Sequence, residues 1–259
     1  MKNKDFTEER RRKIVERVNT KNRVNVEELS RFFDVTKTTI RRDLIALEKD
    51  NLVYRAHGGA VKRESNSIWQ MSSINSRLSQ HEEEKNRIAQ YVARIIHDGE
   101  SIMIDGGSTT TKIAGELCGK KNLLIVTNAL TIGEMLVESG GSKVILSGGE
   151  LLKETNALVG NAAEHSLAVY RTDTAIIGVS GLIPSEGCFS AIPQEAEVKK
   201  IMLQNSRKKI IVTDSSKIGV HALFLFCSMA AVDILVTDRN IKKRDLLALK
   251  KSGVEVIAV

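Results

Sequence analysis

Residues 36–44 read TKTTIRRDL, and this stretch decides the fold of the first quarter of the chain. Thr36 is a favourable N-cap for a helix expected from about residue 37 to residue 50. The apolar positions of that helix recur at i, i+4 and i+7: Ile40, Leu44 and Leu47. Hydroxyl and cationic side chains then occupy the opposite face near the helix N-terminus. This arrangement is typical of a recognition helix that enters the major groove of DNA.

The segments on both sides of this helix predict a helix-turn-helix followed by a wing. Upstream, an apolar helical stripe is expected to end at residues 19–22, and a second helix follows over residues 25–33. A tight break at residues 34–35 separates that helix from the recognition helix. Downstream, residues 52–55 alternate in polarity, and residues 57–61, HGGAV, supply a turn and a return strand. Together these elements indicate a winged-helix DNA-binding module.

The positive charge of the protein is concentrated in the same region. Residues 1–63 contain 17 Lys and Arg against 10 Asp and Glu, whereas residues 64–259 contain 22 of each kind. The formal net charge of +7 therefore belongs to the first quarter of the chain. A basic segment joined to a neutral one favours a polyanion-binding module, although a solvated basic face would give the same counts.

The composition excludes several classes of protein. With 259 residues, 42% hydrophobic and 27% charged, the chain has enough apolar material for one large domain or two unequal ones. The three cysteines have neither metal-ligand nor redox spacing, which suits a reducing cytoplasm. The most apolar stretch, residues 222–236, is too short for a membrane helix, and the N-terminus lacks the apolar core of a signal peptide. We therefore expect a cytoplasmic protein.

Residues 1–63 are expected to form the DNA-binding domain, residues 64–84 a polar linker, and residues 85–259 a second domain. From residue 86 the pattern alternates between helices, the first over residues 87–97, and short apolar strands. The expected strands are 101–105, 123–127, 143–147, 175–179, 210–213, 234–237 and 254–259. Strands of this kind separated by helical segments predict an α/β fold with a mainly parallel sheet covered on both faces.

Residues 6–61 resemble the DeoR/GlpR family of bacterial winged-helix regulators. The resemblance rests on VEEL at residues 26–29, TIRRDL at residues 39–44 and HGGAV at residues 57–61, and it continues over nearly the whole chain. It implies a homo-oligomeric repressor of a carbohydrate-utilisation operon that a phosphorylated sugar releases from operator DNA. It also implies that the second domain resembles the ribose-5-phosphate isomerase and glucosamine-6-phosphate deaminase folds and senses that sugar.

The predicted DNA contacts lie on the recognition helix and the wing. An arginine can bind guanine through two hydrogen bonds, and a threonine offers a hydroxyl or methyl contact. Cations and the wing histidine would contact phosphates. The candidates are Thr36, Lys37, Thr38, Thr39, Arg41, Arg42, Arg55 and His57. An ordinary amphipathic helix with solvated charges is the alternative interpretation.

Residues 105–111, DGGSTTT, follow an expected strand and open a helix. Glycines allow an anion to approach the backbone, the helix N-terminus presents free N–H groups, and the hydroxyls add donors. The loop therefore predicts a phosphate site made by Gly107, Ser108, Thr109 and Thr110, with Asp105 accepting hydrogen bonds from the sugar. The alternative is a common strand-to-helix turn.

The family resemblance adds further effector-binding candidates in later loops. In an open parallel sheet, loops at the carboxyl ends of the strands converge on one crevice, which is where ligands bind. Within the DSSK motif at residues 214–217, the lysine would supply a cation for the phosphate, although an exposed loop lysine is the plainer interpretation. The segment 187–190, GCFS, departs from the usual family pattern. The candidates are Thr127, Asn128, Gly148, Gly149, Lys153, Glu195 and Lys217.

Two other functions remain open from the sequence. The first is a phosphosugar isomerase or deaminase that carries a DNA-binding attachment, with Asp105 or Glu195 as the base. The second is a DNA-binding scaffold with a vestigial sensor. The sequence contains none of the HExxH, GxSxG, Walker A or CxxC patterns, and we expect no metal and no cofactor. A turnover assay on sugar phosphates would separate the regulator from the enzyme.

Overall fold

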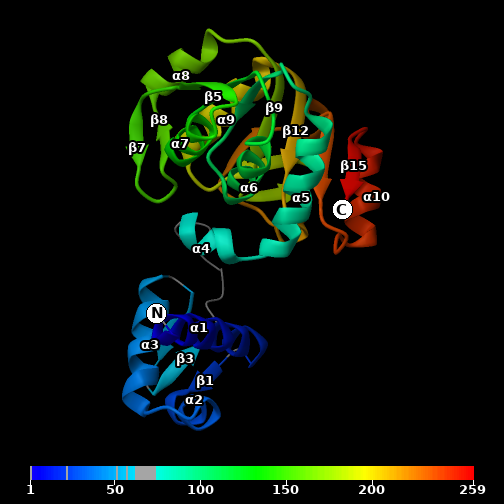
Figure 1. Cartoon of the computed structure of the whole chain (residues 1–259). Coiled ribbons are helices and arrows are strands. Elements are labelled where there is room, and N and C mark those ends of the chain that lie inside the picture. Colours follow the sequence, from blue (N-terminus) through cyan, green and yellow to red (C-terminus); the bar gives the residue numbers. More distant parts are fainter. Residues whose placement is uncertain (1, 22, 51, 57, 62–73) are drawn as a thin grey trace. The chain divides into compact units, whose positions relative to one another are not determined.

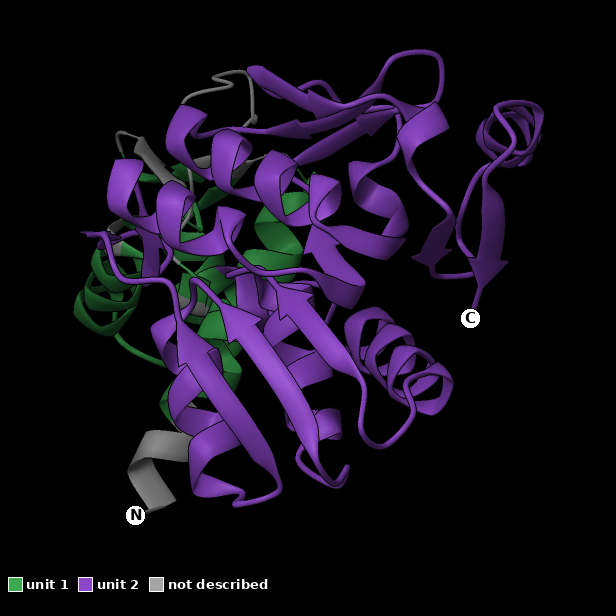
Figure 2. Cartoon of the chain, turned by 90° about the horizontal axis from the view of Figure 1, so that it is seen from above, with its two compact units in different colours: residues 1–76 green, residues 77–259 purple. Residues whose placement is uncertain are grey.

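The computed structural model divides the chain into two units, residues 1–76 and residues 77–259 (Figures 1 and 2). Each unit has its own hydrophobic core. The structure describes residues 2–21, 23–50, 52–56, 58–61 and 74–259.

Three helices form the core of the first unit: α1 (Lys2–Lys21), α2 (Val26–Phe33) and α3 (Lys37–Lys49). Their inward side chains include Ile14, Val18, Leu29, Ile40 and Leu44, which are each at most 1% exposed. Asn25 caps α2, because its Oδ1 accepts the Glu28 N–H at 2.7 Å. Helix α1 continues past the break expected at residue 19, and the Thr20 hydroxyl donates to the Glu16 carbonyl at 2.8 Å.

The predicted wing is confirmed, and it contains one strand more than expected. Strands β2 (Tyr54–Ala56) and β3 (Gly59–Val61) form the antiparallel hairpin. The additional strand β1 (Arg23–Asn25) pairs with the other side of β3. A Cβ on Gly59 would lie 2.0 Å from the Val24 carbonyl oxygen, so only glycine allows this approach. The glycines predict a turn here, but the sequence does not reveal that β3 also pairs with β1. In that pairing Val24 lies opposite Ala60, which is 36 residues further along the chain.

A seven-stranded sheet forms the centre of the second unit, and all of its strand pairs are parallel. This finding confirms the predicted α/β fold with a mainly parallel sheet. In spatial order the strands are β15 (Glu255–Ala258), β14 (Ile234–Thr237), β12 (Ser206–Val212), β9 (Thr172–Gly178), β4 (Ser101–Ile104), β5 (Leu123–Thr127) and β6 (Ser142–Leu146).

Helices cover both faces of this sheet (Figure 2). One face packs against α5 (Glu82–Ile95), α6 (Ser108–Leu117) and α7 (Leu130–Glu138). The other packs against α8 (Asn161–Ala168), α9 (Pro193–Gln204) and α10 (Lys243–Lys251). Along β9, Ile176 joins the first core, whereas Ala175 and Ile177 join the second. A strand buried on both faces has no polar side, which explains the continuous apolar runs in the sequence.

Two smaller antiparallel sheets were not expected from the sequence. Strands β10 (Gly181–Ile183), β11 (Gly187–Ser190) and β13 (Phe224–Cys227) form one sheet, and strands β7 (Glu150–Leu152) and β8 (Ala157–Val159) form a hairpin. All of these strands have three or four residues, too few for a clear alternation of polarity.

Part of the segment expected as a linker, residues 64–84, is helical. Helix α4 (Ile74–Ser79) lies within it, and α5 begins at Glu82 rather than at residue 87. The three glutamates at residues 82–84 make the sequence look like a linker, but acidic side chains in a first helical turn are favourable to the helix dipole.

Candidate functional site

The N-terminus of α3 is fixed by its own side chains. Thr36 Oγ1 accepts the Thr39 N–H at 3.2 Å, which is the predicted N-cap. The two threonine hydroxyls also hydrogen-bond to each other at 2.9 Å. These two hydrogen bonds therefore fix the first turn of α3, which carries part of its polar face.

The predicted DNA-binding side chains of α3 share one surface, which faces away from its buried residues. Lys37, Thr38, Arg41 and Arg42 are exposed, and Thr39 is half-buried. Lys37 forms an ion pair with Glu27 of α2 at 3.0 Å. Arg41 and Arg42 form no ion pair within the described part of the chain, so their guanidinium groups are available for phosphates or bases.

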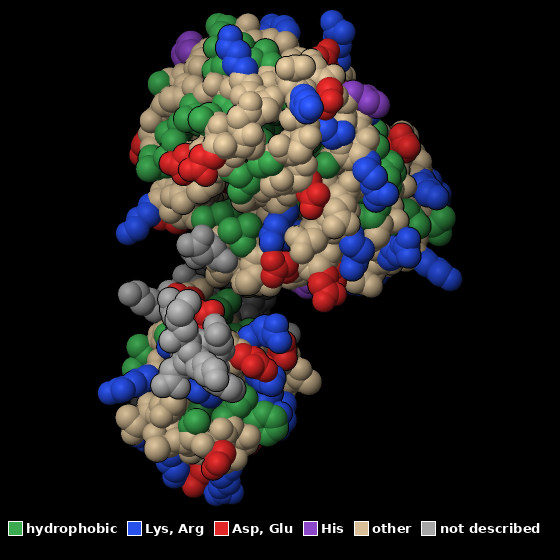
Figure 3. Space-filling view, in the orientation of Figure 1, with side chains coloured by type: hydrophobic (Ala, Val, Ile, Leu, Met, Phe, Trp, Pro, Cys, Tyr) green, Lys and Arg blue, Asp and Glu red, His purple; other side chains and the backbone are tan. Residues whose placement is uncertain are grey.

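A buried carboxylate attaches α3 to α1. Asp43 is 2% exposed, and it accepts hydrogen bonds from Arg10 Nε at 2.7 Å and Arg11 Nε at 3.0 Å. Two cations of the basic segment thus support the core rather than remaining free for a polyanion. Both cationic and acidic side chains appear on the face of the first unit seen in Figure 3.

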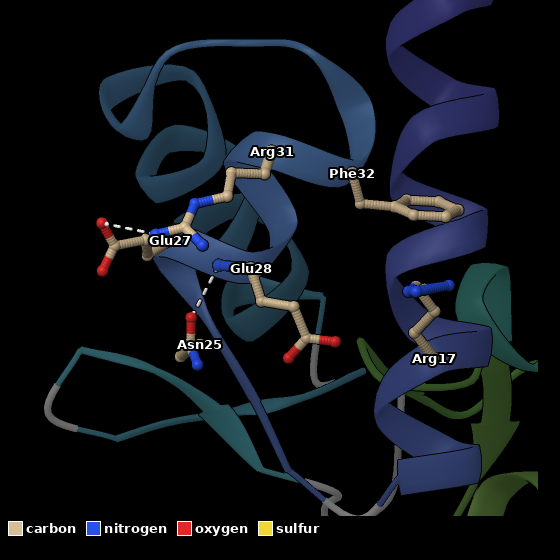
Figure 4. Close-up of a pocket in the computed structure, with 6 residues that line it drawn as sticks. All are labelled: Arg17, Asn25, Glu27, Glu28, Arg31 and Phe32. Carbon is tan, nitrogen blue, oxygen red and sulfur yellow. Dashed lines mark hydrogen bonds and ion pairs between the residues drawn. The ribbon is translucent and has the colours of Figure 1, made fainter.

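The wing and the surface of α2 complete the description of this unit. Arg55 lies in β2 opposite Ala60, and His57 lies outside the described residues. A shallow pocket of about 420 Å³ opens over α2 and α1 (Figure 4). In it the Arg17 guanidinium stacks 3.6 Å above the Phe32 ring. This contact joins the two helices and needs no ligand to explain it.

In the second unit, the predicted phosphate loop is folded by hydrogen bonds of its own threonines. Thr110 Oγ1 accepts the Gly107 N–H at 2.8 Å and donates to the Asp105 carbonyl at 2.7 Å. The Thr111 hydroxyl donates to the Gly107 carbonyl at 2.7 Å. The Thr110 hydroxyl therefore forms its hydrogen bonds within the loop. The backbone N–H groups of the first turn of α6 have no acceptor within the helix, as at any helix N-terminus.

Asp105, at the end of β4, forms a buried ion pair that the sequence did not reveal. Its carboxylate accepts the Gly178 N–H at 2.9 Å and a hydrogen bond from Lys199 Nζ. Lys199 also donates to the Gly178 carbonyl at 2.9 Å. The two side chains are 1% and 7% exposed. Asp105 therefore has protein partners on both oxygens, which limits its use as a base.

The spacing in α9 contains a signal for Lys199. Glu195, Val198, Lys199 and Met202 repeat at i, i+3, i+4 and i+7, and all four are buried. A lysine on the buried face of a helix requires a partner, because an unpaired buried charge is strongly unfavourable. The partner itself lies 94 residues away and could not be identified from the sequence.

The loop after β5 lies beside the predicted phosphate loop. A Cβ on Gly106 would lie 3.2 Å from Ala129 Cβ and 3.1 Å from Ala157 Cβ, so the loops after β4 and β5 meet strand β8. The Thr127 hydroxyl donates to the Ile104 carbonyl at 2.7 Å. Asn128 Nδ2 donates to the Leu158 carbonyl at 3.0 Å, and this bond holds the β7–β8 hairpin.

One buried amide oxygen and one buried carboxylate oxygen in this region have no hydrogen-bond partner among the described residues. They are Asn128 Oδ1 and Glu195 Oε1. Glu195 is 5% exposed, and its other oxygen accepts from the Ser190 hydroxyl at 3.4 Å. A buried acceptor without a donor costs about 1–3 kcal/mol, and a ligand hydroxyl would remove that cost.

The remaining predicted residues occupy neighbouring loops. Gly148 and Gly149 lie between β6 and β7, and both have positive φ angles. Lys153 is exposed in the turn of the β7–β8 hairpin. Lys217 is the last residue of a short 3-10 turn that follows β12. The turn is capped by the Asp214 carboxylate, which accepts the Ser216 N–H at 3.1 Å. Lys217 is half-buried.

Two cations near the site, Arg77 and Lys85, were not among the predicted residues. Lys85 is 3% exposed, and it donates to the backbone carbonyls of Arg77 and Gln80 at the end of α4. Burial lowers the pKa of Lys85 to about 8, against an opposing attraction from Asp214 and a further lowering by Lys217. Nothing in the periodicity of residues 64–85 singles these two cations out.

Other chemistry finds little support in the described residues. No group of three or more His, Cys, Asp or Glu side chains there has an arrangement that could hold a metal ion. A hydrogen bond to Cys227 and burial raise the pKa of the Cys188 thiol, which disfavours a nucleophilic thiolate. None of the described helices combines the length and the apolar character needed to cross a membrane.

Comparisons with known proteins agree with the two units. Residues 10–66 match the model of the DeoR-like helix-turn-helix domain, and residues 80–239 match the model of the DeoR C terminal sensor domain. Among solved structures, ribose 5-phosphate isomerase A from Methanocaldococcus jannaschii aligns with 54% of this chain and 55% of its own, with 15% identity and a TM-score of 0.41.

Curated relatives match over most of their length. The glycerol-3-phosphate regulon repressor of Escherichia coli (strain K12) is 36% identical over 87% of this chain and 88% of its own. The HTH-type transcriptional repressor GlcR of Bacillus subtilis (strain 168) is 31% identical over 97% of this chain and 96% of its own. With its winged helix, its sensor domain and these relatives, the chain belongs to the DeoR family of DNA-binding transcriptional regulators.

Proposed function

We propose that this regulator represses a carbohydrate-utilisation operon and is released from operator DNA by a phosphorylated sugar. The observation that carries the DNA-binding part is the capped polar face of α3, where Lys37, Thr38, Arg41 and Arg42 are all exposed. In a helix-turn-helix these N-terminal positions approach base edges, and neighbouring cations bind phosphates.

The effector would bind at the carboxyl ends of β4, β5, β9 and β12. The first turn of α6, Ser108–Thr110, would receive the phosphate, and Lys217 would add a cation. Asn128 Oδ1 and Glu195 Oε1, a buried amide oxygen and a buried carboxylate oxygen without partners among the described residues, would receive hydrogen bonds from sugar hydroxyls. One of the relatives is a repressor of the glycerol-3-phosphate regulon, which supports a phosphorylated polyol as the effector class.

A homo-oligomer, either a dimer or a tetramer, is the form in which we expect the protein to act. A two-fold dimer would place two α3 helices in major grooves about one helical turn apart or a multiple of it, on a pseudo-palindromic operator. The effector would act by binding more tightly to an arrangement that does not match the operator, because only a difference in affinity shifts an equilibrium.

The test begins with selection of DNA sites by the full chain from a random library, followed by titration of the selected site. Arg41→Ala and Arg42→Ala should each weaken binding by about 1–3 kcal/mol if the arginine reads a base. Arg12→Ala is the control, since Arg12 is exposed on α1 and pairs with Glu16 of the same helix. Equal affinity for all three variants would contradict the assignment of α3.

The effector is then sought by adding glycerol 3-phosphate, glucose 6-phosphate, ribose 5-phosphate and their unphosphorylated parents to the protein–DNA complex. Release by a phosphate ester and not by its parent is the expected result. A parallel turnover assay with the same compounds tests the enzyme alternative. Steady conversion of a sugar phosphate would favour an enzyme over a regulator.

A further inference from the structure

Arg77 has buried guanidinium donors for which the described residues provide no acceptor. It belongs to α4, and its Nε and Nη2 atoms are both buried without a hydrogen-bond partner. A guanidinium carries five N–H donors in a planar fork and keeps its charge under ordinary conditions. Leaving such donors unsatisfied is unfavourable, so the arrangement suggests a partner that binds from outside the protein.

The surroundings of Arg77 belong to the proposed effector site. The carboxylates of Glu195 and Asp105 raise the pKa of Arg77, opposing the larger lowering by burial, so both charges act on the guanidinium. Neither carboxylate forms an ion pair with Arg77. Asp105 is paired with Lys199, and Glu195 Oε1 has no hydrogen-bond partner among the described residues. Unsatisfied donors and an unsatisfied acceptor therefore occur in the same buried region. A ligand with anionic oxygens and hydroxyl groups would satisfy both.

Positive charge gathers around this corner of the second unit. Lys217 and Arg77 both act electrostatically on Lys85, and Asp214 is the acidic group that opposes them there. Lys85 also binds the carbonyls of Arg77 and Gln80, which attaches the end of α4 to α5. The backbone at Arg77 is thus positioned by the protein before any ligand arrives, as an anion site requires.

We propose that the guanidinium of Arg77 binds the anionic group of the effector, so that effector binding fixes α4. This inference rests on the proposed function, and it names a residue through which effector binding would act on the segment between the two units. Helix α4 is the first described element after β3, and residues 62–73, which lie between them in the sequence, are outside the described part. A ligand held by Arg77 therefore acts on the segment that covalently joins the two units.

The first experiment uses inorganic phosphate as the probe and needs no knowledge of the sugar. Phosphate should raise the thermal midpoint of the full chain in a concentration-dependent way, because a ligand that binds only the folded state stabilises it. Arg77→Gln should require about ten-fold more phosphate or above for the same rise, and Arg77→Lys should require less than Arg77→Gln, since lysine keeps the charge but not the fork. Arg87→Gln is the matched control, because Arg87 is an exposed arginine on the adjacent helix α5.

The second experiment is calorimetric titration with the sugar phosphate that binds the wild-type chain most tightly. Arg77→Gln should weaken that binding about ten-fold or more and leave the affinity of the unphosphorylated parent unchanged. The emission of Trp69, the single tryptophan and part of the joining segment, should change on saturation of the wild type but not of Arg77→Gln.

The outcomes separate this inference from the proposed function. If Arg77→Gln and Arg87→Gln respond alike to phosphate and to the sugar phosphate, Arg77 is not the anion ligand and the inference is overturned. The inference also fails if phosphate does not stabilise the wild type and no sugar phosphate binds it. If phosphate stabilises the wild type through Arg77 but no sugar phosphate releases DNA, the anion site stands and the proposed effector class fails. Thermal midpoints without ligand show whether each variant is folded.

Discussion

The ion pair between Asp105 and Lys199 makes the stability of the second unit sensitive to the loss of either side chain. Both side chains are almost fully buried. Removing one partner of a buried pair leaves an uncompensated charge, which costs about 3–5 kcal/mol. Lys199→Met should therefore lower the free energy of unfolding of the second unit by that amount, measured by chemical denaturation. Lys200→Met is the control, because Lys200 is half exposed on the same helix and its pair with Glu197 contributes about 0–1 kcal/mol.

A double-mutant cycle gives the prediction a second arm. Asp105→Asn removes the negative charge but keeps an oxygen that can accept the Gly178 N–H. The double variant Asp105→Asn, Lys199→Met should therefore lose less stability than the sum of the two single losses. Additive losses would show that the charges of the two side chains are not coupled.

Lys85 should make stability depend on pH in the alkaline range. Its pKa is lowered from 10.5 to about 8 by burial, so between those values the unfolded chain binds the additional proton. Stability should consequently rise with pH between about 8 and 10.5, by up to about 3 kcal/mol, because each pKa unit corresponds to 1.36 kcal/mol. Below pH 8 both states are protonated and the cost of the buried charge is fully present.

The measurement is the difference in unfolding free energy between the wild type and Lys85→Met across that range. The raised pKa of Cys188 has the opposite effect, since the unfolded thiol loses its proton first, but it is common to both proteins and cancels in the difference. A difference that stays constant from pH 7 to pH 10.5 would refute the assignment of the titration to Lys85.

At the scale of the element, α3 is held to α1 by a carboxylate rather than by apolar packing alone. Asp43 forms ion pairs with Arg10 and Arg11, and Ile40 and Leu44 face the core. Asp43→Ala should therefore reduce the stability of the first unit by about 1.5–3 kcal/mol, since the remaining arginines are partly exposed, and weaken DNA binding as a consequence. Arg42→Ala should weaken DNA binding with stability within about 0.5 kcal/mol of the wild type. Chemical denaturation and DNA titration of the two variants distinguish the support of the recognition helix from its contact surface.

At the scale of the whole molecule, the concentration of charge in residues 1–63 predicts a steep salt dependence of DNA binding. Each phosphate neutralised adds about −0.9 to the slope of log K against log salt, so six contacts would weaken binding about a thousand-fold between about 50 and 200 mM salt. The measurement is fluorescence anisotropy of a labelled site at several salt concentrations. A slope near zero would argue against contacts from the basic segment.

The division into two units predicts that residues 74–259 behave independently. This fragment contains both cores of the parallel sheet and keeps α4 whole. We expect it to fold, to bind the effector and to have no affinity for DNA, since it lacks the recognition helix. Circular dichroism and titration with DNA and sugar phosphates check the three statements. Salt-sensitive DNA binding by the fragment would contradict the assignment of that activity to the first unit.

The recognition helix, the hairpin and the parallel strands could be predicted from the sequence because their signals are local. Thr36 caps its own helix, and Ile40 and Leu44 repeat within one segment. The loops at the strand ends were predicted for the same reason, since a glycine-rich turn between a strand and a helix is a short pattern. The two small antiparallel sheets and β1 were missed because their strands have only three or four residues, and β1 pairs with a strand distant in the sequence.

The sequence by itself therefore determined the winged helix and the parallel α/β sheet, and it predicted a DNA-binding face on α3 and effector-binding residues at the strand ends. Only the tertiary structure decided which charges are buried and with what partners. Lys199 meets Asp105 across 94 residues, whereas Arg77 has no acceptor among the described residues and lies in a segment that resembles a linker. The physical reason is that burial of a polar group depends on packing between distant elements, whereas caps, turns and periodicity depend on neighbours along the chain.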